Sequence, residues 1–334
     1  MLTQDLIQNL KRLCLSKNMN LWSYVCLKGT FILNLKLQSR EKEYTGEKRR
    51  FIEEICNVFK SVDLRCVRDL LNEVKEALIA NGYRVKVCRV KAVSRVLVGA
   101  SESFGKVPFE VGLFLDHILN VPFIPSSSLK GAFRHALIEL IERRYKGSGV
   151  DGESIASEIF GSEQFSGLVG VTDAYPVEAG INGLIFEPDV ITPHYPGART
   201  EFDVKPTPIS FLTVARGVEF EFFIYLNKQI YELEHRYIQR GMRRSRRKYA
   251  GIGIVDKLEK HRFSGERDFI GYTIYSGDLG KALGEISGIK KEDIIEVIPW
   301  IERAILYAFA KGVGAKTSVG YSRFMIVKYK WVEG

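Results

Sequence analysis

The chain has 334 residues, of which 46% are hydrophobic and 27% are charged, and its formal net charge is +9. This balance is typical of a folded globular protein and excludes intrinsic disorder, collagen and a disulfide scaffold. No uncharged apolar run reaches the roughly 18 residues of a membrane-spanning helix, so we exclude such a helix. The N-terminus lacks the pattern of a signal peptide, and we expect a cytoplasmic protein.

Cysteine and histidine are scattered along the chain. The five cysteines form no CxxC pair, and the five histidines show no HxH or HxxxH spacing. Isolated cysteines without metal-ligand spacing are typical of reduced thiols in an intracellular protein. We therefore predict no metal site and no cofactor.

The N-terminal part of the chain predicts helices in three places, at residues 1–18, 51–60 and 67–82. Apolar residues recur there at helical spacing. Asp63 is a candidate cap for the third helix, and Gly82 is a candidate terminator.

The next part of the chain alternates strand and helix patterns. Residues 83–100 are rich in valine and predict one long strand or two. Residues 126–145 predict a helix that Ser127 or Ser128 caps. The buried stripe of this helix consists of Leu129, Phe133, Ala136, Leu137, Leu140 and Ile141. The remaining expected elements are short strands at 166–190, a loop at 191–209, a strand pair at 211–226, a helix at 292–312 and a strand at 323–332.

This irregular alternation predicts an α+β fold with an antiparallel sheet, for which a ferredoxin-like or RRM-like sheet is the natural candidate. We expect a helical N-terminal region at residues 1–85 and an RRM-like domain at residues 86–334. An insertion at residues 227–290 interrupts the core pattern of that domain.

The positive charge is concentrated in residues 236–263, here called the basic block, which hold ten basic and two acidic side chains. The rest of the chain is close to neutral, with 39 basic and 38 acidic side chains. Such a block is typical of a surface that binds a polyanion, or alternatively of a solvated helix face. It lacks the apolar stripe of a membrane-surface helix. Its candidate binding residues are Arg243, Arg244, Arg246, Arg247 and Lys248.

Residues 124–134, IPSSSLKGAFR, form what we call the helix-start motif. The first amides of a helix are unpaired and carry positive dipole potential, and the two basic residues here are four apart on one face. The glycine between them leaves room for close approach. The pattern predicts an anion-binding helix start, or alternatively a capped helix with incidental basic residues. The candidate residues are Ser127, Ser128, Lys130, Gly131 and Arg134.

Residues 312–324, GVGAKTSVGYSRF, form the glycine loop. Glycines allow positive φ and let backbone amides converge on a phosphate, while basic and hydroxyl side chains add charge and donors. A P-loop is excluded because Ala315 replaces the glycine before the lysine and because the loop follows a helix. A simple helix-terminating turn would explain Gly312 alone. The candidate residues are Gly312, Gly314, Lys316, Thr317, Ser318, Gly320, Tyr321 and Arg323, with Tyr321 the candidate for base stacking.

Together the two motifs resemble those of the RAMP superfamily of CRISPR-associated RNA-binding proteins. Within it, the order of VGLFLDHILNVPFIPSSSLKGAFR, GVTDAYPV, FEPDVITPHYPG and KPTPISFLTVARGVEFEFFIYL resembles the sixth Cmr-type subunit family of type III-B effector complexes. The resemblance covers residues 90–226 and 292–328, and leaves out the N-terminal region and the basic block. Ser126 and Ser322 depart from the family pattern, which has glycine at both positions.

The resemblance implies an RRM-like fold and a non-catalytic subunit that holds the 3′ region of CRISPR RNA by its backbone. It assigns RNA binding to both motifs, and the basic block adds further candidates. The implied partners are CRISPR RNA, target RNA as a second candidate, and other RAMP subunits, without a membrane.

Related subunits of type III complexes resemble metal-dependent ribonucleases that use an aspartate in the loop after the first core strand. Here that loop, residues 99–110, contains Glu102 and Glu110 but no aspartate. His117 and His135 are the candidates for acid–base chemistry. We predict no catalytic residue. A RAMP-family endoribonuclease and an assembly subunit with little RNA contact remain the alternatives.

Overall fold

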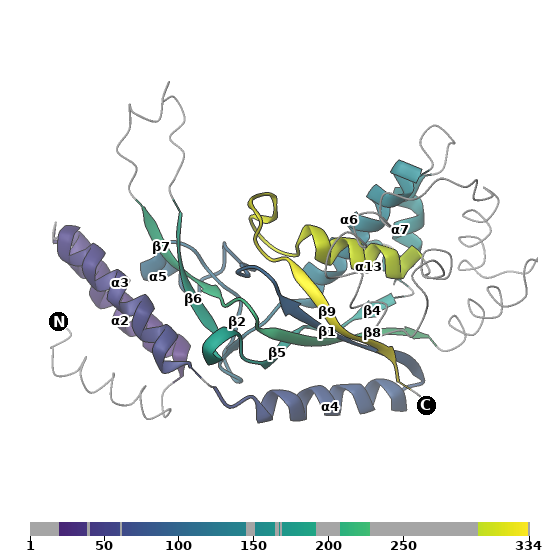
Figure 1. Ribbon diagram of the computed structural model, residues 1–334, viewed down its shortest axis with the longest axis horizontal. Helices are drawn as coiled ribbons and strands as arrows, with labels where there is room; N and C mark the ends of the chain where they lie inside the picture. The colour runs from purple at the N-terminus through teal and green to yellow at the C-terminus, as the bar shows by residue number, and fades with distance from the viewer. Residues whose placement is uncertain are drawn as a thin grey trace, which may run out of the picture.

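A computed structural model of the chain describes residues 20–38, 41–60, 62–144, 151–163, 167, 169–191, 208–227 and 300–332 (Figure 1). The helix predicted at residues 1–18 and the whole basic block lie outside the described residues.

The described residues form an antiparallel sheet of five strands. Its central strand β1 (Tyr83–Ala92) pairs with β8 (Glu219–Asn227) on one side and with β9 (Phe324–Trp331) on the other. Both β4 (Val169–Val171) and β5 (Tyr175–Glu178) pair with the outer side of β8. If β4 and β5 count as one interrupted strand, the sheet has four strands in the spatial order β4/β5, β8, β1, β9. Numbered along the chain, this order is 2-3-1-4. This is the ferredoxin-like order, and the predicted fold class is confirmed.

Two helices cover one face of this sheet. They are α6 (Ser126–Arg144), which follows β1 in the chain, and α13 (Trp300–Lys311), which precedes β9. Phe133 of α6 and Phe309 of α13 meet with ring centroids 5.4 Å apart, and both rings contact Phe222 of β8. All six residues of the predicted stripe are buried, which confirms the helix period read from the sequence.

The opposite face of the sheet is covered by α4 (Arg65–Ala80), which contacts β1, β5 and β8. In Figure 1, α4 runs below the sheet while α6 and α13 lie above it. The Arg68 guanidinium donates to the Val177 carbonyl of β5 at 2.8 Å and fixes α4 on the sheet. Many RRM-like domains bind RNA across an open sheet face. Here α4 covers that face, so the sheet is closed on both sides.

The ends of α4 confirm two residues of the sequence prediction. The Asp63 carboxylate accepts the Arg65 amide at 3.0 Å. Gly82 has φ of +80°, and its amide donates to the Ile79 carbonyl at 2.9 Å.

An antiparallel helix pair stands at one end of the molecule and consists of α2 (Leu21–Leu37) and α3 (Glu41–Val58). It packs on α5 (Lys106–Phe109) and on the hairpin of β6 (Phe186–Ile191) and β7 (Ile209–Val214). The sequence did not predict α2, because its apolar residues lie on all sides and show no helical period. The sequence also predicted only the second half of α3, from residue 51 onward.

The remaining elements are short. A turn joins β2 (Leu115–Asp116) to β3 (Val121–Pro122), and α7 (Gly152–Phe160) packs along α6. Two 3-10 turns, η1 (Ile181–Gly183) and η3 (Thr317–Val319), complete the described elements. None of the helices in this described part is long and apolar enough to cross a membrane.

Candidate nucleic-acid interface

The helix-start motif begins α6 at Ser126, whose amide donates to the Asp173 carboxylate at 2.6 Å. Asp173 lies between β4 and β5, so another part of the chain caps this helix. The prediction that Ser127 or Ser128 caps α6 is wrong, because both residues lie inside its first turn. A carboxylate at this end also offsets the positive dipole potential. A phosphate at this end of α6 would therefore have to be bound by side chains rather than by the helix dipole.

The two basic residues of the helix-start motif have different surroundings. Arg134 forms an ion pair with Glu153 and lies 3.1 Å from the Ser157 hydroxyl, and both partners belong to α7. Lys130 has no acidic partner in the described part of the chain, and partial burial lowers its pKa. Gly131 is exposed, and a Cβ added there would meet nothing within 4 Å. Lys130 and Gly131 thus form the open side of the motif, while Arg134 holds α7.

The glycine loop is fastened by its backbone to the segment that follows β1. The Ala315 amide donates to the Leu97 carbonyl at 2.8 Å. A Cβ at Gly314 would lie 2.6 Å from the same carbonyl, and φ there is +131°, so this position requires glycine. Gly312 and Gly320 also have positive φ, of +112° and +94°. The loop therefore has a fixed shape set by its own glycines.

Ser322 replaces the glycine that the family pattern has at the end of this loop. Its side chain is fully buried and its φ is +57°, a left-handed conformation that glycine adopts more easily. The Ser322 hydroxyl accepts the Leu97 amide at 3.0 Å and lies 3.4 Å from the Leu97 carbonyl. The serine therefore fastens the loop with a side-chain hydrogen bond that glycine cannot make.

The outer part of the glycine loop offers donors and cations. The amides of Gly314, Lys316, Thr317 and Ser318 have no acceptor among the residues that the structure describes. In the same part of the chain, the side chains of Lys316 and Arg323 have no acidic partner. Several free amides beside two cations suit an anion such as phosphate. The predicted donors and cations therefore lie together on this loop, and their binding of RNA stays a prediction.

A ladder of backbone hydrogen bonds connects the two motifs. Leu97 bonds to the glycine loop, and the next carbonyl, that of Val98, accepts the Phe114 amide at 3.0 Å. The Phe114 carbonyl accepts the Phe123 amide at 3.3 Å, and Phe123 directly precedes the helix-start motif. Neighbouring hydrogen-bonded segments lie about 5 Å apart, so three steps place Phe123, at the edge of the helix-start motif, roughly 15 Å from the glycine loop. A few nucleotides of one strand can span that distance.

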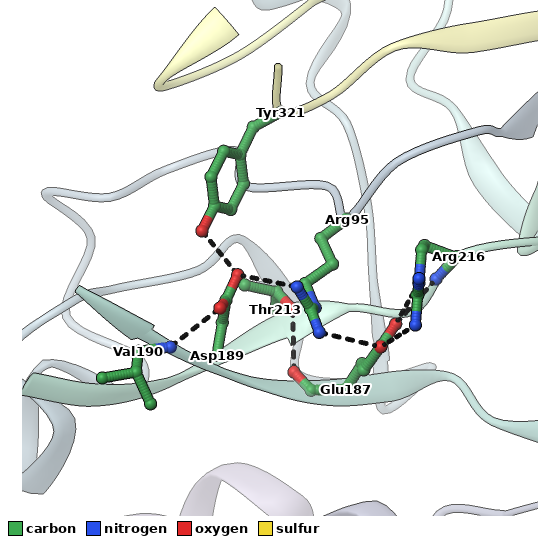
Figure 2. Close-up of polar contacts among 7 residues, drawn as sticks. All are labelled: Arg95, Glu187, Asp189, Val190, Thr213, Arg216 and Tyr321. Carbon is green, nitrogen blue, oxygen red and sulfur yellow. Dashed lines mark hydrogen bonds and ion pairs between the residues drawn. The ribbon is translucent and has the colours of Figure 1, made fainter. Parts of the chain in front are cut away.

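Tyr321, predicted to stack on a base, is tied to β6 by its hydroxyl (Figure 2). The hydroxyl donates to Asp189 at 2.5 Å, and burial together with this bond raises the pKa of Tyr321 to about 12. The Arg95 guanidinium lies 3.6 Å from Asp189 and 3.2 Å from Glu187, and Arg216 lies 2.7 Å from Glu187. This network joins the glycine loop to the β6–β7 hairpin. Arg95 and Glu187 were not predicted, because they belong to no local motif.

The loop that follows β1 is held by the N-terminal helices. Phe104 and Phe109 are almost completely buried there against aromatic rings of α2 and α3. Glu110 lies 3.3 Å from the Lys48 ammonium of α3, so this carboxylate has a cationic partner within the protein. His117 and His135, the acid–base candidates, are both exposed. The described residues contain no group of three or more histidine, cysteine, aspartate or glutamate side chains that could hold a metal ion.

Comparison with known proteins agrees with this fold. Residues 89–324 match the family model of the RAMP superfamily. The CRISPR system CMR subunit Cmr6 of Saccharolobus solfataricus is 33% identical over 201 residues, which are 59% of this chain and 66% of that relative. The match thus spans just under two thirds of the relative's own length.

Solved structures extend the comparison. A chain of the Type III-B Cmr-beta, solved by cryo-EM bound to cognate target RNA, superposes with a TM-score of 0.66 and 26% identity over 99% of both chains. Cmr6 from Pyrococcus furiosus gives a TM-score of 0.33 and 19% identity, covering 73% of this chain and 98% of that one, which is too low to support an argument. Because the family model covers well over half of the sequence, this chain belongs to the RAMP superfamily.

Proposed function

We propose that this chain is a non-catalytic RNA-binding subunit of a type III-B CRISPR ribonucleoprotein effector. It holds the 3′ region of the CRISPR RNA by its sugar–phosphate backbone, next to other RAMP subunits in the cytoplasm. The glycine loop carries the proposal, because it presents free amides beside Lys316 and Arg323 on the surface. The cryo-EM relative supports the proposal, because it is a chain of the Type III-B Cmr-beta that was solved bound to cognate target RNA.

The proposed recognition is independent of sequence. Backbone amides and lysine side chains bind phosphate oxygens, which are the same in every nucleotide. Lys130 supplies a further cation at the helix-start motif, and the open space at Gly131 admits a sugar or phosphate. Arg134 holds α7 in place through its ion pair with Glu153 and is not assigned a phosphate contact.

The absence of catalysis is part of the proposal. In related subunits the loop after the first strand provides a metal-binding aspartate. Here Phe104 and Phe109 anchor that loop in the core, and Lys48 is the partner of Glu110. Incubation of the full chain with labelled RNA and Mg²⁺ or Mn²⁺ leaves the RNA intact on this account. Cleavage that disappears in a Glu102→Gln variant would support the endoribonuclease instead.

Variants with reduced charge test the RNA-binding proposal. Each phosphate contact with single-stranded RNA contributes about 0.7 to the slope of log K against log salt. Combining Lys130→Ala with Lys316→Ala therefore weakens binding to all RNA sequences alike and reduces the slope by about 1.4. The matched control combines Lys42→Ala with Lys60→Ala, two exposed lysines in and just after α3. Equal affinity and slope for the test variant, the control and wild type contradict the proposal.

The basic block, residues 236–263, is proposed to strengthen the attraction to RNA, although it lies outside the described residues. Deleting it lowers RNA affinity and leaves assembly with the other subunits intact. The reverse result supports the assembly subunit with little RNA contact.

A further inference from the structure

Three neighbouring aromatic rings, of which two are stacked and one is tilted, lie at the surface and are here called the aromatic platform: Phe114, Phe123 and Tyr175. The Phe123 ring lies 5.6 Å from that of Tyr175 at an angle of 16°, and 5.6 Å from that of Phe114 at 56°. Near-parallel rings at this distance are offset, so each covers only part of the other's face. All three rings are partly exposed. Phe114 and Tyr175 pack on the hydrophobic core, whereas in the described part of the chain Phe123 does not.

The platform lies between the two motifs that are proposed to bind the RNA backbone. Phe114 and Phe123 form two rungs of the ladder that leads from the glycine loop to the helix-start motif. Phe123 and Tyr175 flank a backbone bridge in which Ile124 and Ala174 exchange two hydrogen bonds of 2.9 Å. A strand that runs from one motif to the other therefore passes close to these rings.

The position of Tyr175 is fixed by a second set of bonds. Its hydroxyl donates to one Asp116 oxygen at 3.0 Å, and burial together with this bond raises the pKa of Tyr175. The other Asp116 oxygen accepts the amides of Ile118 and Leu119 at 2.8 Å each. The ring is thus held in place before any ligand arrives, which lowers the entropy that binding has to overcome.

We propose that the aromatic platform stacks a base of the RNA strand whose backbone the two motifs hold. This inference rests on the proposed function. Aromatic rings interleaved with cationic segments are the arrangement by which proteins bind single-stranded nucleic acids. Asp116 and Asp173 border the platform, and their negative charge disfavours a phosphate there. Stacking of this kind places a base without reading the sequence.

A fluorescent base analogue tests this inference directly. The probe is a single-stranded oligoadenosine RNA that carries 2-aminopurine at one position at a time, bound to the full chain. Wild type quenches the fluorescence most at the position that stacks. A Phe123→Leu variant keeps the apolar volume, loses that quenching and binds about tenfold more weakly, as expected for the loss of one stacking ring. A Phe123→Trp variant keeps the quenching.

The controls separate this inference from the proposed function. A Phe31→Leu variant alters a partly buried ring on α2 and leaves quenching and affinity unchanged. The salt slope is also unchanged in Phe123→Leu, because no phosphate contact is lost. If Phe123→Leu binds and quenches like wild type while the Lys130 and Lys316 variants bind weakly, the platform is not a base site and the proposed function stands. If Phe123→Leu instead loses only its association with other subunits, the platform binds protein and the inference is overturned.

Discussion

Ser322 gives a quantitative test of how the glycine loop is fastened. Its hydroxyl is the acceptor for the Leu97 amide at 3.0 Å in a fully buried position. A Ser322→Ala substitution removes the acceptor and leaves that amide unpaired in the interior. An unsatisfied buried donor costs about 1–3 kcal/mol of the free energy of unfolding. We expect a loss in that range for Ser322→Ala.

A Ser322→Gly variant separates the hydrogen bond from the backbone conformation. It loses the same hydrogen bond, but glycine adopts φ of +57° without the left-handed penalty of about 1–2 kcal/mol that other residues carry. The larger conformational entropy of glycine in the unfolded chain offsets about 0.5–1 kcal/mol of that gain. We therefore expect Ser322→Gly to be more stable than Ser322→Ala by up to about 1.5 kcal/mol.

Denaturant unfolding of the full chain, followed by near-UV circular dichroism, measures both differences. RNA affinity measured on the same samples shows whether a loosened loop also binds less well. The reasoning is refuted if Ser322→Ala unfolds at the wild-type denaturant concentration, or if Ser322→Gly is the less stable of the two variants.

Three further predictions follow from the site. Arg134→Ala lowers the free energy of unfolding by at most about 1 kcal/mol, because the ion pair with Glu153 is partly exposed. The same variant leaves the salt slope of RNA binding unchanged. An altered slope would show that Arg134 contacts a phosphate. The hydrogen bond of Tyr321 stabilises the fold fully below pH 10, and this contribution is lost as pH rises towards 12, because the pKa of Tyr321 is raised in the folded state. The free energy of unfolding of Tyr321→Phe therefore falls less between pH 10 and pH 12 than that of wild type. An equal fall in both proteins would contradict the assignment. Gly131→Ala raises the free energy of unfolding by about 1 kcal/mol, because the position is inside a helix and has open space for a methyl group. The same variant weakens RNA binding. Unchanged affinity would show that RNA does not approach this position.

Elements with a clear period were the ones that the sequence predicted best. The stripe of α6 and the ends of α4 follow from spacing and from residues such as Asp63 and Gly82. By contrast, α2 has no such period and was missed, since only its packing against α3 and α5 shows which side is buried.

The candidate site was predicted in outline but not in its contacts. The residue types of both motifs were identified from the sequence because each motif is continuous. The cap of α6 by Asp173, and the pairing of Arg134 with Glu153, join residues that are distant in sequence. Only the folded chain brings such partners together, as it does for Phe123 and Tyr175 in the aromatic platform.

The central claim is that the glycine loop and the helix-start motif form one RNA-binding surface. Photo-crosslinking of bound RNA to the full chain, with the crosslinked residues mapped by mass spectrometry, tests it most directly. We predict crosslinks in residues 312–324 and 124–134, with further crosslinks at the aromatic platform between them. Crosslinks confined to α2, α3 and α4, with none in either motif, would contradict the account.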